Sequence, residues 1–310
     1  MGDLNWTDDQ WRKVNEAVND AFGKASVAST FLPLYGPLSG GTETVRNERL
    51  ATGRDRDRLT IRLDGDDDDA NQRLVNLTVK VELSSEQVAD ETLPNALLAF
   101  RRAANILALE QDRVVFRGLV DGEKETDSVY VVNKKRSLGL VEAAGTLESV
   151  KVEGPEDPGL GLNRVGIGVV SAVVTAITKL EENFHSGPFA CVLGNKLFEA
   201  VQQPSFAFVL PSDRITPLLK GPLLRGGRLE PETGIVVSLG ANTVDLVIGT
   251  PPTVQFLQRK EDAKFLFRVY TRFALRIRDK RNPPIAGFMA PPEKADEGRT
   301  PADTGETEVK

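Results

Sequence analysis

The chain has 310 residues, of which 39 are Lys or Arg and 45 are Asp or Glu, so its formal charge at pH 7 is −6. Hydrophobic residues make up 40% and charged residues 27%, an ordinary globular composition that excludes disorder of the whole chain. The acidic balance argues against a nucleic-acid-binding protein, which would usually carry a net basic domain. A single cysteine, Cys191, excludes an internal disulfide, and a single histidine, His185, excludes a site built on two imidazoles from one chain.

No segment predicts export or membrane insertion. The start, MGDLNWTDDQW, lacks the basic and apolar regions of a signal peptide. The longest apolar stretch, 165–177, is too short and too glycine-interrupted to span a bilayer, which takes about 20 residues. We therefore expect a soluble cytoplasmic protein with no membrane partner.

An amphipathic helix is predicted near the N-terminus. Thr7 at its cap and Gln10 three residues later can satisfy two otherwise unpaired backbone amides. Its apolar stripe then follows at steps of three and four: Trp11, Val14, Val18 and Phe22. The stripe leaves open whether this helix packs on its own domain or on a partner chain.

Two strands follow and predict a long hairpin arm. Apolar and polar residues alternate over 59–63 and again over 75–83, the period of half-buried strands. The linking segment, 64–71, is rich in aspartate, but its spacing does not fit an EF-hand calcium loop, and we interpret it as a solvated turn. Such an arm is too long to bury its apolar rows alone, so it needs a neighbouring subunit.

The central part of the chain predicts two helices, over 93–116 and 164–184, with a buried strand at Phe189–Leu193. Residues 204–228 are rich in proline and glycine and predict an exposed loop. Residues 235–239 and 244–248 flank a turn signal and predict a hairpin.

The last regular element is a long strand at Phe265–Ile277, with one apolar face and one basic face. Its arginines either protect a solvent-facing sheet edge or meet acidic residues of a neighbouring subunit, and the sequence leaves both open: Arg268, Arg272, Arg276 and Arg278. Residues from Ala290 onward predict a disordered tail.

No catalytic motif stands out. The stretch 159–164 fails the dinucleotide pattern because Arg164 replaces its third glycine, and no phosphate-binding GxxxxGK[ST] loop occurs. His185 follows a predicted helix, which suits a cation near the helix C-terminus better than a nucleophile's partner. Cys191 lies in an apolar strand, as a buried inert thiol would. We expect no catalytic residue and no metal site.

Three ordered segments together carry a family resemblance. The first is Trp6–Pro37, and the second is Leu74–Leu83 followed by a helix that ends EQDRVVFRG. The third is HSGPFACVL at 185–193, which continues through the strands to Ile277. This set resembles the encapsulin shell proteins (the linocin-like bacteriocin family), which share the fold of tailed-phage major capsid proteins.

The resemblance implies an α+β, tailed-phage capsid-type fold with five parts. These are an N-terminal helix and inner segment (1–42), an extended loop arm (43–83), a peripheral domain (84–135 and 250–289), an axial domain (136–249) and a disordered tail (290–310).

The resemblance also implies a function: a homo-oligomeric shell subunit of an icosahedral cytoplasmic nanocompartment, which takes up a peroxidase or ferritin-like cargo enzyme by that enzyme's C-terminal peptide. Residues matching the family's cargo-binding positions are Phe31, Leu34, Tyr35, Val254, Phe256 and Leu257. Residues placed in the pore loop by position are Pro204, Ser205, Phe206, Ser212, Asp213 and Arg214.

Some relatives bind flavin beside an aromatic residue after the arm strand. Here Ser84–Gln87 offers none, so no flavin or other cofactor is expected. The alternative within the fold is a phage or prophage major capsid protein. A bacteriocin or protease is a further alternative, against which the lack of a nucleophile–base pair argues.

Overall fold

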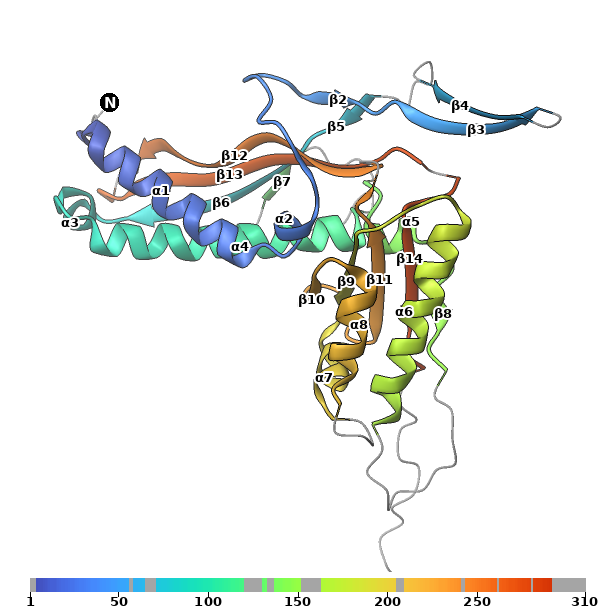
Figure 1. Cartoon of the computed structure of the whole chain (residues 1–310). Coiled ribbons are helices and arrows are strands. Elements are labelled where there is room, and N and C mark those ends of the chain that lie inside the picture. The colour runs from blue at the N-terminus through green and yellow to red at the C-terminus, as the bar shows by residue number, and fades with distance from the viewer. Residues whose placement is uncertain are drawn as a thin grey trace, which may run out of the picture.

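A computed structural model describes residues 4–291 except 56–57, 65–70, 120–129, 133–136, 152–162, 205–208, 241–242, 261 and 280. Figure 1 shows a long domain of sheet and helices, a second domain that descends from one end of it, and a hairpin arm that extends beyond the sheet. The architecture is the predicted α+β class. The tail predicted from Ala290 lies outside the described residues beyond 291.

The first domain is built on a five-stranded sheet in the order β1-β12-β13-β6-β7. Its strands are β1 (Leu34–Tyr35), β6 (Val75–Leu83), β7 (Tyr130–Val132), β12 (Val244–Arg259) and β13 (Phe265–Ile277). All pairs are antiparallel except β1 with β12. The bounds of β13 confirm the strand predicted from its alternating pattern, and its apolar residues Phe267, Val269 and Phe273 are fully buried.

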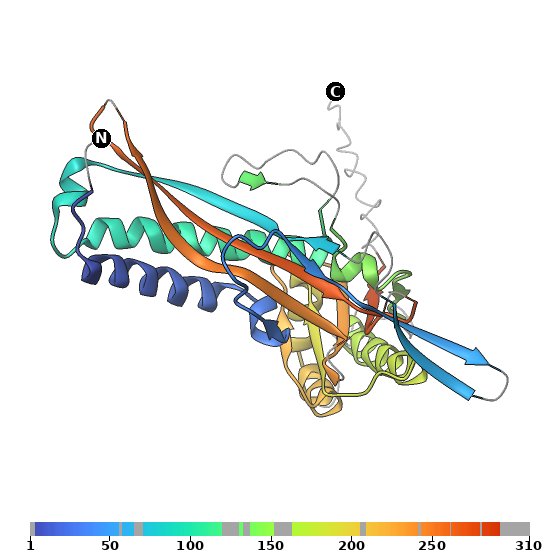
Figure 2. The same ribbon diagram turned by 90° about the horizontal axis from the view of Figure 1, so that it is seen from above.

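Helices α1 (Asp8–Ala25) and α4 (Pro94–Arg117) lie side by side under this sheet (Figure 2). The predicted capping box of Thr7 and Gln10 is confirmed at the start of α1. Val14 and Val18 are fully buried in the domain core, so the helix packs on its own chain rather than on a partner. Ahead of α1, Trp6 stacks on Phe267, with ring centroids 5.1 Å apart.

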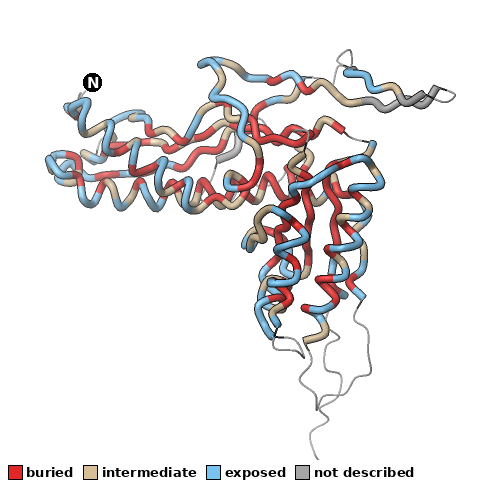
Figure 3. Tube along the Cα trace, in the orientation of Figure 1, coloured by how far each residue is buried: buried red, intermediate tan, exposed pale blue. Residues whose placement is uncertain are grey.

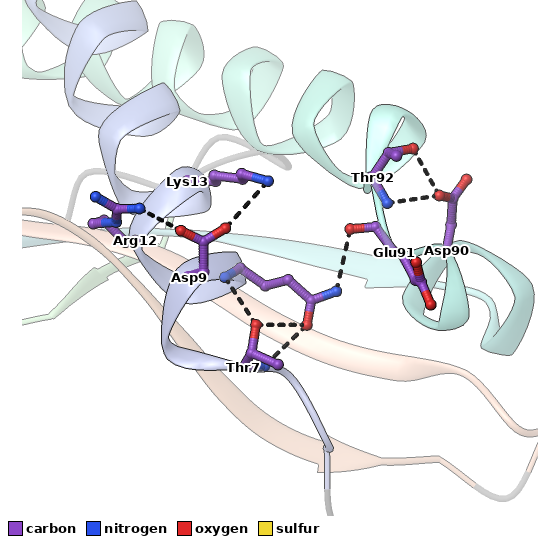
Figure 4. A network of polar contacts seen from close by, with 8 residues as sticks. Thr7, Asp9, Arg12, Lys13, Asp90, Glu91 and Thr92 are labelled. Carbon is purple, nitrogen blue, oxygen red and sulfur yellow. Dashed lines mark hydrogen bonds and ion pairs between the residues drawn. The ribbon is translucent and has the colours of Figure 1, made fainter.

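The start of α1 is also tied to the turn before α4. Gln10 Nε2 donates to the carbonyl of Glu91 at 3.4 Å, and Asp90 accepts from the amide and the hydroxyl of Thr92 in the same turn (Figure 4). A short helix, α3 (Ser85–Ala89), precedes that turn and has a capping box of its own.

A buried carboxylate fixes the end of the N-terminal segment. Asp112 of α4 accepts hydrogen bonds from the amides of Val27 and Ala28, at 2.7 and 3.0 Å, and from the Ser26 hydroxyl at 3.0 Å. It therefore supplies, from another helix, the acceptor that the start of α2 (Ala28–Phe31) lacks in its own cap. Burial raises the pKa of Asp112 to about 6, against these hydrogen bonds, which lower it.

The arm consists of two pairs of strands. β3 (Arg49–Asp55) pairs with β4 (Arg58–Asp64), and β2 (Thr44–Arg46) pairs with β5 (Asn71–Arg73). The predicted hairpin between 59–63 and 75–83 is wrong, because β6 pairs with β13 in the first sheet. The true partner, β3, has no regular apolar alternation in its sequence RLATGRD, so periodicity could not detect it.

The base of the arm covers the face of the sheet opposite the helices. Val45 and Leu74 pack there on Val247 and Ala274, in a small core separate from the main one. We call this contact the arm anchor. Hydrogen bonds reinforce it: Gln72 Nε2 donates to the Leu275 carbonyl at 2.7 Å, and the Leu50 amide donates to the Arg278 carbonyl at 2.9 Å.

A buried ion pair lies within the arm anchor. Arg276 of β13 binds both carboxylate oxygens of Asp245 on β12, at 2.8 and 2.6 Å. Arg278 lies 3.6 Å from the same carboxylate, and Arg276 also donates to the Arg46 carbonyl of β2 at 3.2 Å. The guanidinium therefore joins both long strands to the arm.

The second domain has its own five-stranded sheet in the order β10-β9-β11-β14-β8. These strands are β8 (Glu148–Ser149), β9 (Phe189–Leu193), β10 (Leu223–Arg225), β11 (Thr233–Ser238) and β14 (Ile285–Met289). The helices packed on it are α6 (Arg164–Glu182), α7 (Asn195–Gln202) and α8 (Pro211–Leu219), while α5 (Leu140–Ala143) contacts α4 and β14 near the junction. Figure 3 shows that buried residues follow both sheets and the helix faces turned toward them.

The predictions for α4, α6 and β9 are confirmed, and two others fail in this region. The predicted hairpin of 235–239 with 244–248 is wrong, because β11 and β12 belong to different sheets and the chain crosses between the domains there. The predicted loop 204–228 contains α8 and β10. Pro211 occupies the first turn of α8, where a proline is tolerated, so proline content misled the prediction.

Replacement of Asp112 by Asn leaves one acceptor oxygen facing three donors, and we expect a loss of about 2 kcal/mol in the free energy of unfolding. Because the pKa of Asp112 is raised in the folded chain, the folded chain binds a proton at this carboxyl group more tightly than the unfolded chain does. This proton binding adds to the free energy of unfolding of the wild type at low pH, and the added stability is lost as pH rises through about 6. The stability gap between wild type and D112N should widen from pH 7.5 to pH 5.

Urea unfolding followed by tryptophan fluorescence measures this gap, since Trp6 and Trp11 both report on the N-terminal segment. D213N, at an exposed aspartate, is the control. A gap that stays constant or narrows toward pH 5 contradicts the assignment.

Replacement of Arg276 by Met leaves the Asp245 carboxylate buried with Arg278 at 3.6 Å as its remaining cation. We expect this variant to lose about 3 kcal/mol, because it removes both close hydrogen bonds to a buried carboxylate and leaves it one longer ion pair. The double variant D245N/R276M should recover part of the loss. R268M, at a half-buried arginine that binds Gln255 and lies over the Tyr270 ring but contacts no buried charge, should lose only about 1 kcal/mol in the same urea titration. Equal losses in R276M and R268M would show that the buried pair has no special role.

Candidate functional site

The outermost strand of the first sheet presents two of the predicted cargo-binding residues. Leu34 is 58% exposed and Tyr35 is 50% exposed, although both are large and apolar or aromatic. Their strand, β1, pairs with β12 on one side, and no strand among the described residues pairs with its other side. We call this the open edge.

The backbone of the open edge has an amide and a carbonyl that could form hydrogen bonds with a bound peptide. The Leu246 amide donates to the Pro33 carbonyl at 2.9 Å, so in the parallel pattern the amide and carbonyl of Leu34 point away from β12. Pro33 and Pro37 flank the strand and keep it short, as is typical of protected sheet edges. The open edge thus combines exposed apolar side chains with an amide and a carbonyl of Leu34 that have no backbone partner in the described part of the chain.

The other predicted cargo-binding residues do not join this edge. Phe31 and Val254 are only 6% and 5% exposed, so their side chains belong to the core. Phe256 is half-buried and packs against Phe265 and Phe267. Leu257 is 40% exposed, but it lies eleven residues along β12 from Leu246, the partner of Leu34, which is more than about 30 Å in an extended strand.

The structure therefore divides the predicted patch into two groups within one subunit. Leu34 and Tyr35 form the open edge, and Leu257 lies near the far end of β12, where the Val254 amide donates to Asn15 Oδ1 of α1 at 3.2 Å. The sequence did not predict this separation between Leu257 and the open edge, because it does not show where β1 pairs along β12.

One residue of the open edge was not predicted. The Arg276 guanidinium lies over the ring of Tyr35, 4.7 Å from its centroid, while it binds Asp245. Stacking of this kind holds the ring in place, and Tyr35 remains half exposed. The only sequence signal was the position of Arg276 in the arginine row, which does not specify a partner.

Within the described chain, members of that arginine row contact groups of their own subunit, and whether any of them also meets acidic residues of a neighbouring subunit stays a prediction. Arg268 binds the Gln255 side chain, Arg272 donates to the Thr42 carbonyl, and Arg276 is buried against Asp245. The row binds the subunit's own strands and arm because the arm folds back over this face of the sheet.

The predicted pore residues do not all lie in one loop. Pro204 is exposed two residues after the end of α7, and Ser205 and Phe206 lie outside the described residues. Ser212, Asp213 and Arg214 belong to the first half of α8, with Ser212 buried and the other two exposed. Whether these residues line a pore stays a prediction.

The arm carries exposed apolar residues beyond its anchor. Ile61 and Leu63 of β4 are 67% and 59% exposed, on a hairpin that Figures 1 and 2 show extending away from both domains. An isolated two-stranded hairpin is marginally stable in water, so a neighbour over this face would stabilise it.

The titratable side chains singled out in the sequence have structural contacts. His185 Nε2 lies 2.6 Å from the Asn282 carbonyl, and burial raises the pKa of the Cys191 thiol far above its ordinary value. Across the described ranges, no three His, Cys, Asp or Glu side chains come close enough to hold a metal ion. None of the helices described combines the length and apolar character that crossing a membrane requires.

Comparison with solved structures shows a known fold. The virus-like particle from Pyrococcus furiosus is similar with a TM-score of 0.61 at 14% identity, over 90% of this chain and 98% of that one. The capsid of Myoviridae phage XM1 is similar with a TM-score of 0.54 at 15% identity, over 83% and 89%. The two-domain body with its arm is therefore the tailed-phage capsid-type fold.

Sequence comparison narrows this to one family. The chain is 25% identical over 286 residues to the type 1 encapsulin shell protein EncA of Myxococcus xanthus (strain DK1622), covering 87% of this chain and 90% of that protein. It is 22% identical over 298 residues to a diheme-cytochrome-encapsulin shell fusion protein of Kuenenia stuttgartiensis, covering 89% and 72%. Residues 3–274 match the Linocin_M18 family, described as encapsulating protein for peroxidase, so the chain belongs to this family and is an encapsulin shell protein.

Proposed function

We propose that the shell formed by this protein encloses a peroxidase or ferritin-like enzyme in the cytoplasm and has no catalysis of its own. The cargo enzyme is captured by its C-terminal peptide, and the open edge is the primary contact. The description of the family as encapsulating a peroxidase supports the cargo class.

The observation that carries this proposal is the exposure of Leu34 and Tyr35 on a strand with an open side. An extended peptide can add to such an edge, with backbone hydrogen bonds to Leu34 and apolar side chains over Leu34 and the Tyr35 ring. Arg276 beneath the ring limits its movement, which lowers the entropy lost on binding. Leu257 is the exposed member of the second group and would meet only a longer segment of cargo.

Replacement of Leu34 by Glu places a charge where the peptide's apolar residues would pack. Burial of one leucine side chain is worth about 1.5 to 3 kcal/mol, so we expect at least a roughly tenfold loss of captured cargo with particle yield unchanged. The measurement is the ratio of fluorescence to shell protein in purified particles. The reporter is a fluorescent protein that carries the C-terminal extension of an encapsulated peroxidase, with a ferritin-like extension as a second reporter.

L98E is the matched control, since Leu98 of α4 is 67% exposed and distant in sequence from the open edge. It should retain cargo. Equal cargo in L34E, L98E and wild-type particles would exclude the open edge as the docking site, and failure of both reporters to enter wild-type particles would count against capture by a C-terminal peptide.

Assembly should depend on the apolar residues of the arm. The double variant I61E/L63E removes two exposed apolar side chains that a neighbouring subunit would cover, and we expect it to shift the protein from particles to small oligomers in light scattering. R62Q, on the opposite face of the same strand, should assemble normally. Tryptophan fluorescence should be unchanged in both, and full assembly of I61E/L63E would show that the arm's apolar face is not an interface.

A further inference from the structure

The segment that connects α1 to the open edge carries no charge and ends in a very short strand. No Asp, Glu, Lys or Arg occurs over residues 25–42. The two residues of β1 pair only with Leu246 and Val247 of β12, whereas strands usually span about five or six residues. Pairing of this length fixes a strand weakly, so contacts outside β1 are needed to hold the open edge in place.

Two buried charged side chains contact this segment, one at each end. Arg276 of β13 lies over the Tyr35 ring at its end, 4.7 Å from the ring centroid. Asp112 of α4 contacts its start, where the carboxylate accepts from the amides of Val27 and Ala28 at 2.7 and 3.0 Å. Both charged side chains are almost fully buried. Each end of the segment is therefore fixed by a charged group from another element.

The Asp112 carboxylate completes the cap of α2, which contacts α4 (Figure 1). α2 is a single turn, and Val27 at its cap makes no capping hydrogen bond with its own side chain. The Ser26 hydroxyl accepts from the Ser29 amide at 3.2 Å and donates to Asp112 at 3.0 Å, and Gln111 Nε2 donates to the Ser29 hydroxyl at 3.1 Å. One helical turn is costly to form alone, so α2 depends on these acceptors from α4.

The cap of α2 is ionised at neutral pH. Burial raises the pKa of Asp112 to about 6, while its three hydrogen bonds and the charge of Arg228 act to lower it. Arg228 is held against α4 by its carbonyl, which accepts from Arg117 Nε at 3.0 Å. Hydrogen bonds to an ionised acceptor are stronger than those between neutral groups. An amide side chain at position 112 would therefore weaken the cap.

The position of α2 determines the position of the open edge. Leu32 is buried, and its amide donates to the Ala28 carbonyl at 3.1 Å. The next residue, Pro33, already accepts from the Leu246 amide of β12 at 2.9 Å. Only five residues separate Ala28 from Leu34, so the chain has little slack between the bonds to Asp112 and the exposed strand. A displacement of the α2 start is therefore passed on to Leu34.

We propose that Asp112 is a positioning residue for cargo capture, which fixes the start of α2 and thereby holds Leu34 and Tyr35 in the conformation that receives the cargo peptide. The role rests on the proposed function, in which the open edge binds that peptide. Asp112 is buried and does not touch the cargo itself. Its loss should weaken capture without removing capture sites, because a preformed edge lowers the entropy lost on binding.

Loading curves of D112N shells test this role. The fluorescent reporter with the peroxidase extension is co-expressed at graded levels, and the ratio of fluorescence to shell protein is measured in purified particles. We expect the reporter level at half-maximal loading to rise about fivefold in D112N, because the cap that preorganises the edge is weakened. Maximal loading should stay at the wild-type value, since Leu34 and Tyr35 are still present.

S238A is the matched control for a general loss of stability. Ser238 is buried in the second domain, where its hydroxyl donates to the Ser186 carbonyl at 2.6 Å. The variant loses a buried hydrogen bond and should load like wild type. S26A, which deletes one of the three donors to Asp112, should shift the curve in the same direction as D112N by a smaller factor, and it tests the role even if D112N forms no particles.

A relocated carboxylate tests whether the cap itself matters. Ser26 has the extended backbone of an N-cap residue, with φ −80° and ψ 120°, and aspartate is a favoured N-cap. S26D/D112N moves the carboxylate from α4 to the start of α2 and should recover most of the wild-type loading curve.

The outcomes separate this role from the proposed function. Wild-type curves from D112N and S26A, an equal shift in S238A, or no recovery in S26D/D112N would overturn the role of Asp112. If L34E loses cargo while D112N loads normally, the open edge remains the docking site and only the positioning role is wrong. If L34E also loads normally, the proposed docking site is wrong as well.

Discussion

The β12–β13 pair must be covered on both faces, and the rest of the subunit is arranged around that requirement. These two strands span 16 and 13 residues and form the centre of the first sheet. On one face, α1 and α4 bury Phe267 and Phe273. On the other face, the arm anchor covers Val247 and Ala274 and encloses the Arg276–Asp245 pair. A sheet that was covered on one face only would leave that ion pair in water, where it would stabilise little.

The same guanidinium is shared by two functional parts of the subunit. Arg276 contacts Tyr35 at the open edge and the Arg46 carbonyl at the arm base. The edge that we propose for cargo binding and the arm that we propose to contact neighbouring subunits therefore both depend on one buried group. This arrangement favours a rigid subunit, since a shift of the arm would disturb Tyr35 directly.

Local patterns in the sequence predicted the regular elements, but they could not predict the contacts between distant parts of the chain. The spacing of apolar residues located α4, α6 and β13, and the Thr7–Gln10 box located the start of α1, because these signals lie within a few residues. The partner of β6, the partner of Arg276 and the burial of Phe31 and Val254 depend on segments that are not adjacent in the chain. Residue periodicity carries no information about them.

The candidate site was predictable to a similar extent. Leu34 and Tyr35 follow from the family resemblance and are exposed, but their separation from Leu257 depends on where β1 pairs along β12.

The arm anchor also ties assembly to the order of synthesis. Its hydrogen bonds join Thr42, Arg46 and Asn47 to residues 230 positions later in the chain, and Gln72 to a residue 203 positions later. A ribosome therefore makes the arm some 200 residues before the strand that supports it. An incomplete chain therefore carries an arm with no base and cannot offer it to neighbours in a fixed direction. The fold in this way restricts shell assembly to full-length subunits, and prematurely terminated chains are not incorporated into the shell.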